Sequence, residues 1–151
     1  MSTRFFTPAL ANRTLPLVRK IVEDILTKGK ELRRIAGMRS DANHAELERL
    51  GNEIRLHIEE LSAVGCEYKD WSFDVGVVDF PARIRGRHVY LCWRSDEDRV
   101  EFFHGVESGI AGRRRIPHFL LEDGTNLVSK RREAGPRQDS VNEEVEASGD
   151  R

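Results

Sequence analysis

The feature that most constrains this chain is a change of hydrophobic period at Gly65. Before Gly65, apolar residues recur at steps of three and four, the spacing that places side chains on one stripe of an α-helix. After Gly65, short runs rich in β-branched and aromatic residues are separated by turn residues, which is typical of strands. Helices followed by strands predict an α+β domain rather than an alternating parallel sheet.

The first helical region begins with Thr7 and Pro8, a good N-cap and first-turn pair, because proline lacks the N–H that the first turn cannot satisfy. A short helix is expected through "PALAN". Thr14 is then expected to cap a separate long helix ahead of Pro16, with an apolar stripe that starts at Leu17.

A second long helix is expected after the break at Gly37. It starts at about Asn43 and ends at Gly65, which is suited to a left-handed cap. Two long helices with a short connection predict an antiparallel helical hairpin over about residues 7–65. Both apolar stripes are wider than a coiled-coil seam, so we expect other surfaces to cover them, either the rest of the chain or a second copy.

Three strands are expected in the small antiparallel β-sheet of residues 66–120: "GVVDFP", stopped by Pro81, then "RHVYLCWR" and "RVEFFH". We place the tight turn of the last pair at Asp96 and Glu97, so that facing residues have numbers that sum to 193. Strand alternation then divides the side chains between two faces. The face with Tyr90, Cys92, Arg94, Arg99, Glu101 and Phe103 is expected to be free, and the face with Val89, Leu91, Trp93, Val100, Phe102 and His104 is expected to pack on the helices.

The domain boundary is expected near residue 126. Residues 1–126 are predicted to form a single α+β domain, and residues 127–151 a disordered C-terminal tail, because this segment has almost no large apolar side chains. A chain of 151 residues with this composition suffices for one hydrophobic core and not for two, so a single domain is expected.

Charge and cysteine content limit the function classes. A formal net charge of −1 argues against a chain whose main task is to coat nucleic acid or an anionic membrane. Two cysteines cannot form a disulfide framework, and the first residues do not resemble a secretory signal, so a cytoplasmic protein is expected. No apolar run approaches the roughly 20 residues that span a bilayer.

Several segments resemble, in order and spacing, the bacterial proteins of domain-of-unknown-function family 2203. They are "FTPALANRTLP", "GVVDFP", "VYLCWRSDED", "RVEFFH" and "GIAGR", and together they extend over residues 4 to 116. The resemblance implies a small bacterial cytoplasmic protein and supplies no activity. The chain departs from the family pattern at Ala9 and Leu10, at Asp96 and at Phe103.

The candidate ligand-binding residues are polar side chains in or beside the strand-like segments: Asp79, Arg94, Glu101, His104 and Arg113. Asp79, Glu101 and His104 are suited to hold a divalent metal or to act as acid and base, with an arginine binding an anion. The alternative is structural: Arg94 pairs with Glu101, Cys92 packs as a small hydrophobe, and His104 bonds backbone. No metal motif is present, and no cofactor is strongly indicated.

Two functions from different classes remain. The first is a non-catalytic module that forms a homo-oligomer or binds a protein partner through the helical hairpin, because the apolar stripes need more cover than a three-strand sheet supplies. The alternative is a small enzyme or a ligand or metal sensor that uses the polar residues of the β-hairpin. No catalytic residue is assigned.

Overall fold

The computed structural model describes residues 4–38 and 41–121 and has the element order expected of an α+β fold. The elements are α1 (Pro8–Ala36), α2 (His44–Val64), β1 (Glu67–Tyr68), β2 (Val77–Ile84), β3 (Arg87–Arg94), β4 (Phe102–Gly105) and β5 (Arg114–Arg115), with short 3-10 helices at Asp41–Asn43, Ile110–Gly112 and His118–Leu121. The strands form one antiparallel sheet in the order β1-β2-β3-β4-β5. The α+β class is confirmed, whereas the predicted tail at 127–151 lies outside the described residues.

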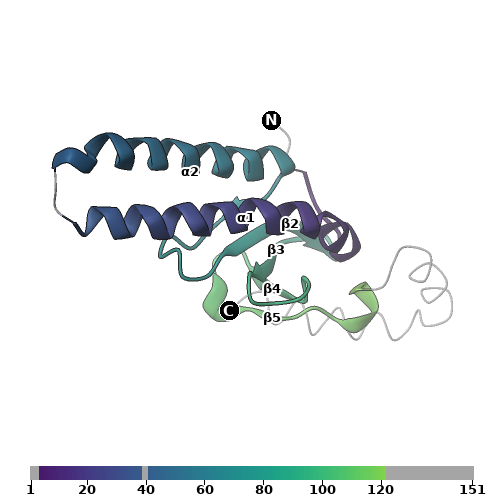
Figure 1. Ribbon diagram of the computed structural model, residues 1–151. Helices are drawn as coiled ribbons and strands as arrows, with labels where there is room; N and C mark the ends of the chain where they lie inside the picture. Colours follow the sequence, from purple (N-terminus) through teal and green to yellow (C-terminus); the bar gives the residue numbers. More distant parts are fainter. Residues whose placement is uncertain (1–3, 39–40, 122–151) are drawn as a thin grey trace.

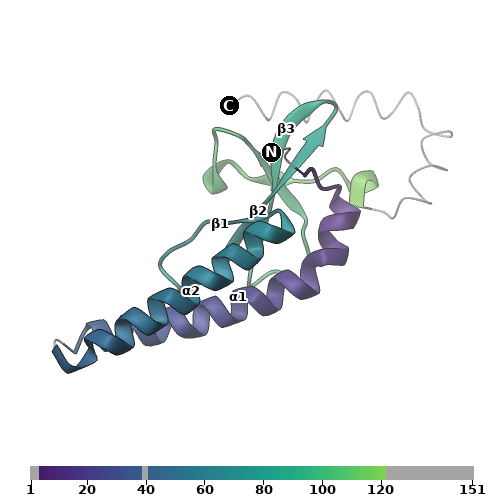
Figure 2. The same ribbon diagram turned by 90° about the horizontal axis from the view of Figure 1, so that it is seen from above.

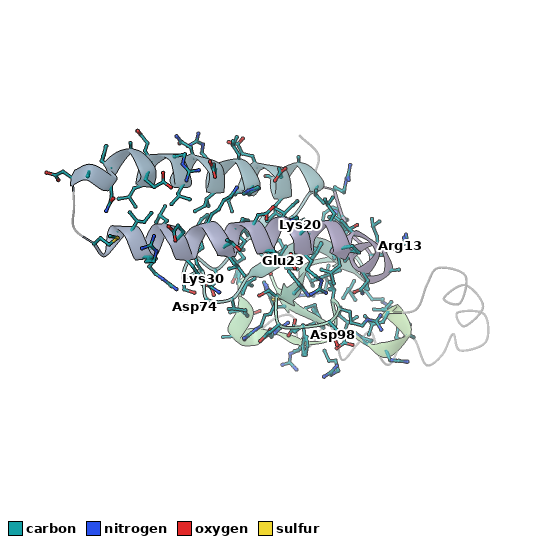
Figure 3. All side chains as sticks on the ribbon, in the orientation of Figure 1. Arg13, Lys20, Glu23, Lys30, Asp74 and Asp98 are labelled. Atoms are coloured by element: carbon teal, nitrogen blue, oxygen red, sulfur yellow. The ribbon has the colours of Figure 1, made fainter. Side chains whose placement is uncertain are left out.

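The helices and the sheet form two layers. Figure 1 shows α1 and α2 side by side over one face of the sheet, and Figure 2 shows their far ends extending beyond it. Val22 and Ile25 of α1 share one core with Phe80 of β2 and Trp93 of β3. The outer surface of α1 carries the charged side chains of Arg13, Lys20, Glu23 and Lys30 (Figure 3). No helix in the described part of the chain is long and apolar enough to cross a membrane.

The N-terminal helix is continuous, contrary to the prediction of two. Thr7 is its N-cap, as expected, and accepts a hydrogen bond from the Leu10 N–H at 3.1 Å. Thr14 is not a cap, because its hydroxyl donates to the Leu10 carbonyl at 2.8 Å inside the helix. Pro16 lies within the helix. Because α1 continues through Pro16, Leu15 stays in the buried stripe. The free energy gained by burying Leu15 offsets the loss of the helical hydrogen bond that proline cannot make.

The second helix ends as predicted. Gly65 has a φ of 112°, the left-handed conformation that glycine adopts without strain. Its N–H donates to the carbonyls of Leu61 and Ser62, both at 3.0 Å. The chain then turns directly into β1, and this turn brings the sheet against the helices.

Pro81 does not stop β2, which continues to Ile84. The Pro81 carbonyl accepts a hydrogen bond from the Phe6 N–H at 2.7 Å, so the backbone of Pro81 faces away from β3. Its missing N–H therefore removes no bond between β2 and β3. β1 pairs with β2 only at Val78 and Asp79, so at Pro81 the outer edge of β2 is met by Phe6 alone, and a proline is tolerated there.

The register of β3 and β4 is shifted by one residue from the prediction. Tyr90 faces His104 and Cys92 faces Phe102, so facing numbers sum to 194. A one-residue shift moves every side chain of one strand to the other face. Phe102 and His104 therefore lie on the face of Cys92, away from the helices, and their predicted packing on the helices is wrong. Trp93, which is 0% exposed, packs in the core as expected.

Candidate functional site

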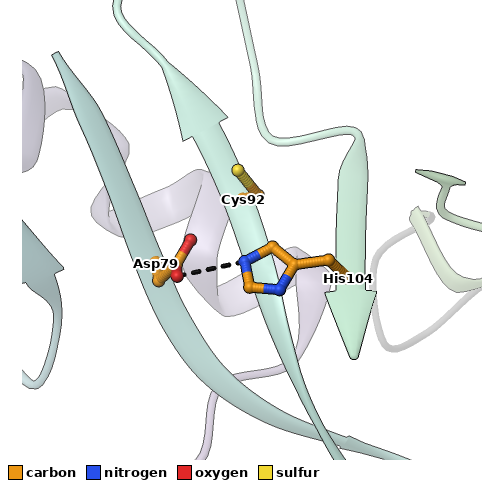
Figure 4. A group of neighbouring side chains, drawn as sticks. All are labelled: Asp79, Cys92 and His104. Carbon is orange, nitrogen blue, oxygen red and sulfur yellow. Dashed lines mark hydrogen bonds and ion pairs between the residues drawn. The ribbon is translucent and has the colours of Figure 1, made fainter. Parts of the chain in front are cut away.

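Three neighbouring strands place Asp79, Cys92 and His104 together on the sheet face opposite the helices. Asp79 of β2 pairs with Cys92 of β3. His104 of β4 is the diagonal neighbour of Cys92 on the same face, two residues beyond Phe102, which pairs with Cys92. The three side chains point into a common space (Figure 4). They are 2%, 0% and 4% exposed, and one ligand atom of each lies within 4.8 Å of the others. A buried carboxylate, thiol and imidazole thus form one cluster.

Both ring nitrogens of His104 are engaged. Nδ1 donates to the Gly105 carbonyl at 2.7 Å, and Nε2 lies 3.0 Å from Oδ2 of Asp79. Burial lowers the pKa of His104, but the hydrogen bonds to Asp79 and to the Gly105 carbonyl outweigh this effect, so the pKa is raised above its usual value. The pair is a buried imidazole and carboxylate in direct contact.

Asp79 and Cys92, the other two members of the cluster, differ in their capacity to bind a further group. Oδ1 of Asp79 is buried and has no hydrogen-bond partner among the described residues. Burial first, and the charge of Asp79 second, raise the pKa of the Cys92 thiol to about 12. A thiol that keeps its proton at neutral pH is a poor nucleophile. Asp79 is therefore the group in the cluster with unused binding capacity.

A pocket of about 300 Å³ opens beside this cluster and reaches two of its members, Asp79 and His104. The other lining residues are Lys69, Asp70, Val77, Tyr90, Val106, Gly109 and Ile110. Val106 and Ile110 belong to the segment that follows β4, and both are exposed, at 50% and 41%. The pocket thus has a mixed rim, with Val106 and Ile110 beside the exposed Lys69, and a buried polar floor of Asp79 and His104.

The other three predicted site residues do not join the cluster. Arg94 pairs with Asp96 rather than with Glu101, at 3.2 and 3.1 Å. Glu101 lies 3.4 Å from Arg115 and is not a member of the cluster of Asp79, Cys92 and His104.

Arg113 is held by the protein itself. Its guanidinium binds Glu97 at 2.8 and 2.9 Å, donates to the Cys92 carbonyl at 3.1 Å and lies 4.1 Å from the centre of the Phe102 ring. These contacts use donors on both terminal nitrogens of the guanidinium, and Nε is left buried without a partner among the described residues. Arg113 therefore supports the strand behind the cluster instead of lining the pocket.

Cys92 is the site residue that the sequence argument underrated. With facing numbers that sum to 193, the thiol and His104 lie on opposite faces, whereas the observed register puts them on one face. The signal that could have revealed this is Glu97. Its side chain accepts from the Arg94 N–H at 2.9 Å, and its N–H donates to the Arg94 carbonyl at 2.9 Å, so the turn spans Arg94 to Glu97 instead of being centred on Asp96 and Glu97.

A family model described as "Uncharacterized conserved protein (DUF2203)" matches residues 4–116. The chain belongs to this family. The matched range contains α1, α2, the five strands and all three members of the cluster, so the resemblance stated from the sequence is confirmed. Comparisons with curated proteins and with solved structures each found no match to this DUF2203 chain.

Proposed function

We propose that this protein binds a small ligand in the pocket on the open face of the sheet, as an enzyme or a sensor. The observation that carries the proposal is the buried Asp79–His104 pair at the floor of a pocket of about 300 Å³, with Oδ1 of Asp79 unpaired among the described residues. Buried polar atoms nearly always have a partner, so an unpaired carboxylate oxygen at a pocket floor favours a bound group at this position.

The lining residues restrict the class of ligand. The volume is at the small end of the range for ligand sites. Val77, Val106 and Ile110 suit an apolar body, while the polar end of the ligand is expected to face Asp79 and His104. Lys69 at the rim is paired with Glu67 at 3.1 Å, which reduces its attraction for anions. A small molecule with one polar end fits this lining best.

A fragment screen tests the proposal. Ile110→Trp fills the pocket from an exposed position, and Leu56→Trp, at a 56% exposed position on α2, is the matched control. Fragments that raise the Tm of the wild type and of Leu56→Trp are expected to lose this effect on Ile110→Trp. Amide NMR shifts of the wild type should centre on the lining residues. Fragments that bind Ile110→Trp equally well, or a screen without any shift at the lining residues, would contradict the proposal.

A second candidate function is self-association of the two helices, acting as a hairpin, with a second copy of the chain. Self-association was expected because a three-strand sheet would leave the apolar stripes uncovered, but within one chain Val18, Val22 and Leu61 of these stripes are already buried. The observation that still favours it is that the helices extend beyond the sheet (Figure 2) and expose Met38 and Leu56, each at 56%. Light scattering should then give a dimer that Leu56→Lys dissociates; a monomer at micromolar concentration excludes this candidate.

A further inference from the structure

The geometry points to a site for a divalent transition-metal ion of the zinc class, held by Asp79, Cys92 and His104 at the pocket floor. This inference deepens the proposed function, because the ion would be the polar group that a ligand of the pocket meets. The three side chains offer oxygen, sulfur and nitrogen donors from three adjacent strands (Figure 4). Such a mixed donor set suits zinc and its neighbours rather than Mg²⁺ or Ca²⁺, which prefer oxygen ligands.

The orientation of His104 is that of a metal ligand. Nδ1 lies 2.7 Å from the Gly105 carbonyl and donates its proton there, so Nε2 is the nitrogen that can bind a metal once its own proton is displaced. In metal sites the second nitrogen of a histidine is fixed in the same way, by donation to a carbonyl or a carboxylate. The backbone of β4 therefore presents Nε2 to the cluster.

A proton or a metal ion must lie between Nε2 of His104 and Oδ2 of Asp79. The two atoms are 3.0 Å apart, and their lone pairs would repel each other if nothing lay between them. Either a proton or a metal ion removes this repulsion. With a proton at this position, Oδ1 of Asp79 has no partner among the residues that the structure describes. A metal ion would also draw negative charge from the whole carboxylate, including Oδ1.

The distances and charges fit a tetrahedral ion. Bond lengths of about 2.0–2.3 Å place the ligand atoms of such an ion roughly 3.3–3.6 Å apart. The donor atoms here lie within 4.8 Å of one another, so small side-chain rotations suffice. A carboxylate, a thiolate and a neutral imidazole carry two negative charges, which a divalent ion neutralises as it displaces protons from the thiol and the imidazole.

The fourth position of the ion would face the pocket. Asp79 and His104 line the pocket, whereas Cys92 lies beneath them and is 0% exposed. Three protein ligands with one position open to a water or a ligand is the arrangement of reactive zinc sites, in contrast to the four closed ligands of structural ones. The ligand class that follows is a small molecule whose polar end donates an electron pair to the metal, such as a carboxylate or a hydroxamate.

Titration of the full-length, chelator-treated protein with Co²⁺ tests the inference. One equivalent should produce the near-ultraviolet band of a thiolate-bound Co²⁺, and Zn²⁺ but not Mg²⁺ should remove it. Cys92→Ser should abolish the band, while Cys66→Ser, which changes the other buried cysteine, should keep it. Asp79→Asn should weaken binding by at least about 10–100-fold, the size of effect seen even for outer-sphere partners. Circular dichroism establishes that each variant is folded.

X-ray absorption of the zinc-loaded wild type supplies a measurement that needs no variant. One sulfur and two or three nitrogen or oxygen scatterers are expected. The inference is overturned by a zinc shell without sulfur, by binding that survives Cys92→Ser and Asp79→Asn, or by no stoichiometric binding. Ile110→Trp separates the ligand proposal from the metal proposal, because it blocks the pocket and should leave the Co²⁺ band intact. A failure of fragment binding and a failure of metal binding can therefore be told apart.

Discussion

Gly29 and Gly51 are both helical glycines, and their replacement by alanine should have opposite effects. Alanine is favoured over glycine in a helix by about 1 kcal/mol. A Cβ at Gly51 of α2 meets no atom within 4 Å, so Gly51→Ala should raise the free energy of unfolding by about that amount. A Cβ at Gly29 of α1 lies 2.2 Å from Cδ1 and Cγ of Phe73.

The clash at Gly29 gives the size of the effect. Carbon atoms in contact are ordinarily about 3.5–4.0 Å apart, so the Phe73 ring must move by more than about 1 Å. Phe73 has a φ of 65°, a conformation that few non-glycine residues adopt, and this restricts how its backbone can follow. Overpacking of this kind costs about 1–3 kcal/mol, so Gly29→Ala should lower the free energy of unfolding by about 1 kcal/mol despite the gain in helix propensity.

Urea unfolding, followed by far-ultraviolet circular dichroism, measures both variants. The expected difference between them is about 2 kcal/mol. Trp71, whose ring centre is 6.3 Å from that of Phe73, should change its fluorescence in Gly29→Ala and not in Gly51→Ala. If Gly29→Ala stabilises the protein as much as Gly51→Ala does, the packing of Phe73 on α1 is not as described.

Two further predictions concern buried polar groups. The Asn12 side chain accepts from the Val100 N–H at 2.7 Å and donates to the Val100 carbonyl at 3.1 Å, so Asn12→Ala should lower the free energy of unfolding by about 2 kcal/mol in urea. A loss no larger than that of the exposed Asn52→Ala contradicts this role. Burial raises the pKa of the Cys66 thiol to about 12, so in Cys92→Ser the remaining thiol should react with a disulfide reagent at pH 8 only after unfolding. Rapid reaction of the folded protein would refute this.

The helices were predictable because their signals are local. The apolar spacing, the Thr7 cap and the left-handed Gly65 each depend on residues within a few positions, and all are found in the structure. The two errors at proline arise from tertiary context. Pro16 remains inside α1 because burial of neighbouring side chains offsets its missing N–H. Pro81 remains inside β2 because its missing N–H faces the outer edge, away from β3.

The candidate site was less predictable because it depends on register. Asp79 and His104 were identified from residue type, and the structure brings them together. Whether Cys92 belongs to the site depends on the register between β3 and β4. A shift of one residue in this register determines whether His104 lies on the face of Cys92 or on the face of the helices. Glu97 closes the turn at Arg94 through its N–H and its side chain, and no hydrophobic pattern indicates where that turn lies.

The proline in β2 also has a consequence for how the protein meets other chains. Beyond the short partner β1, the outer edge of β2 is met by Phe6, and the adjacent Pro81 has no N–H to offer. An exposed strand edge is a template on which another chain can add and start aggregation, and short edge partners and prolines are the usual protections against it. At this edge Phe6 occupies the Pro81 carbonyl and the buried Pro81 offers no N–H, so the residue predicted to end the strand instead helps to close its edge to a further strand.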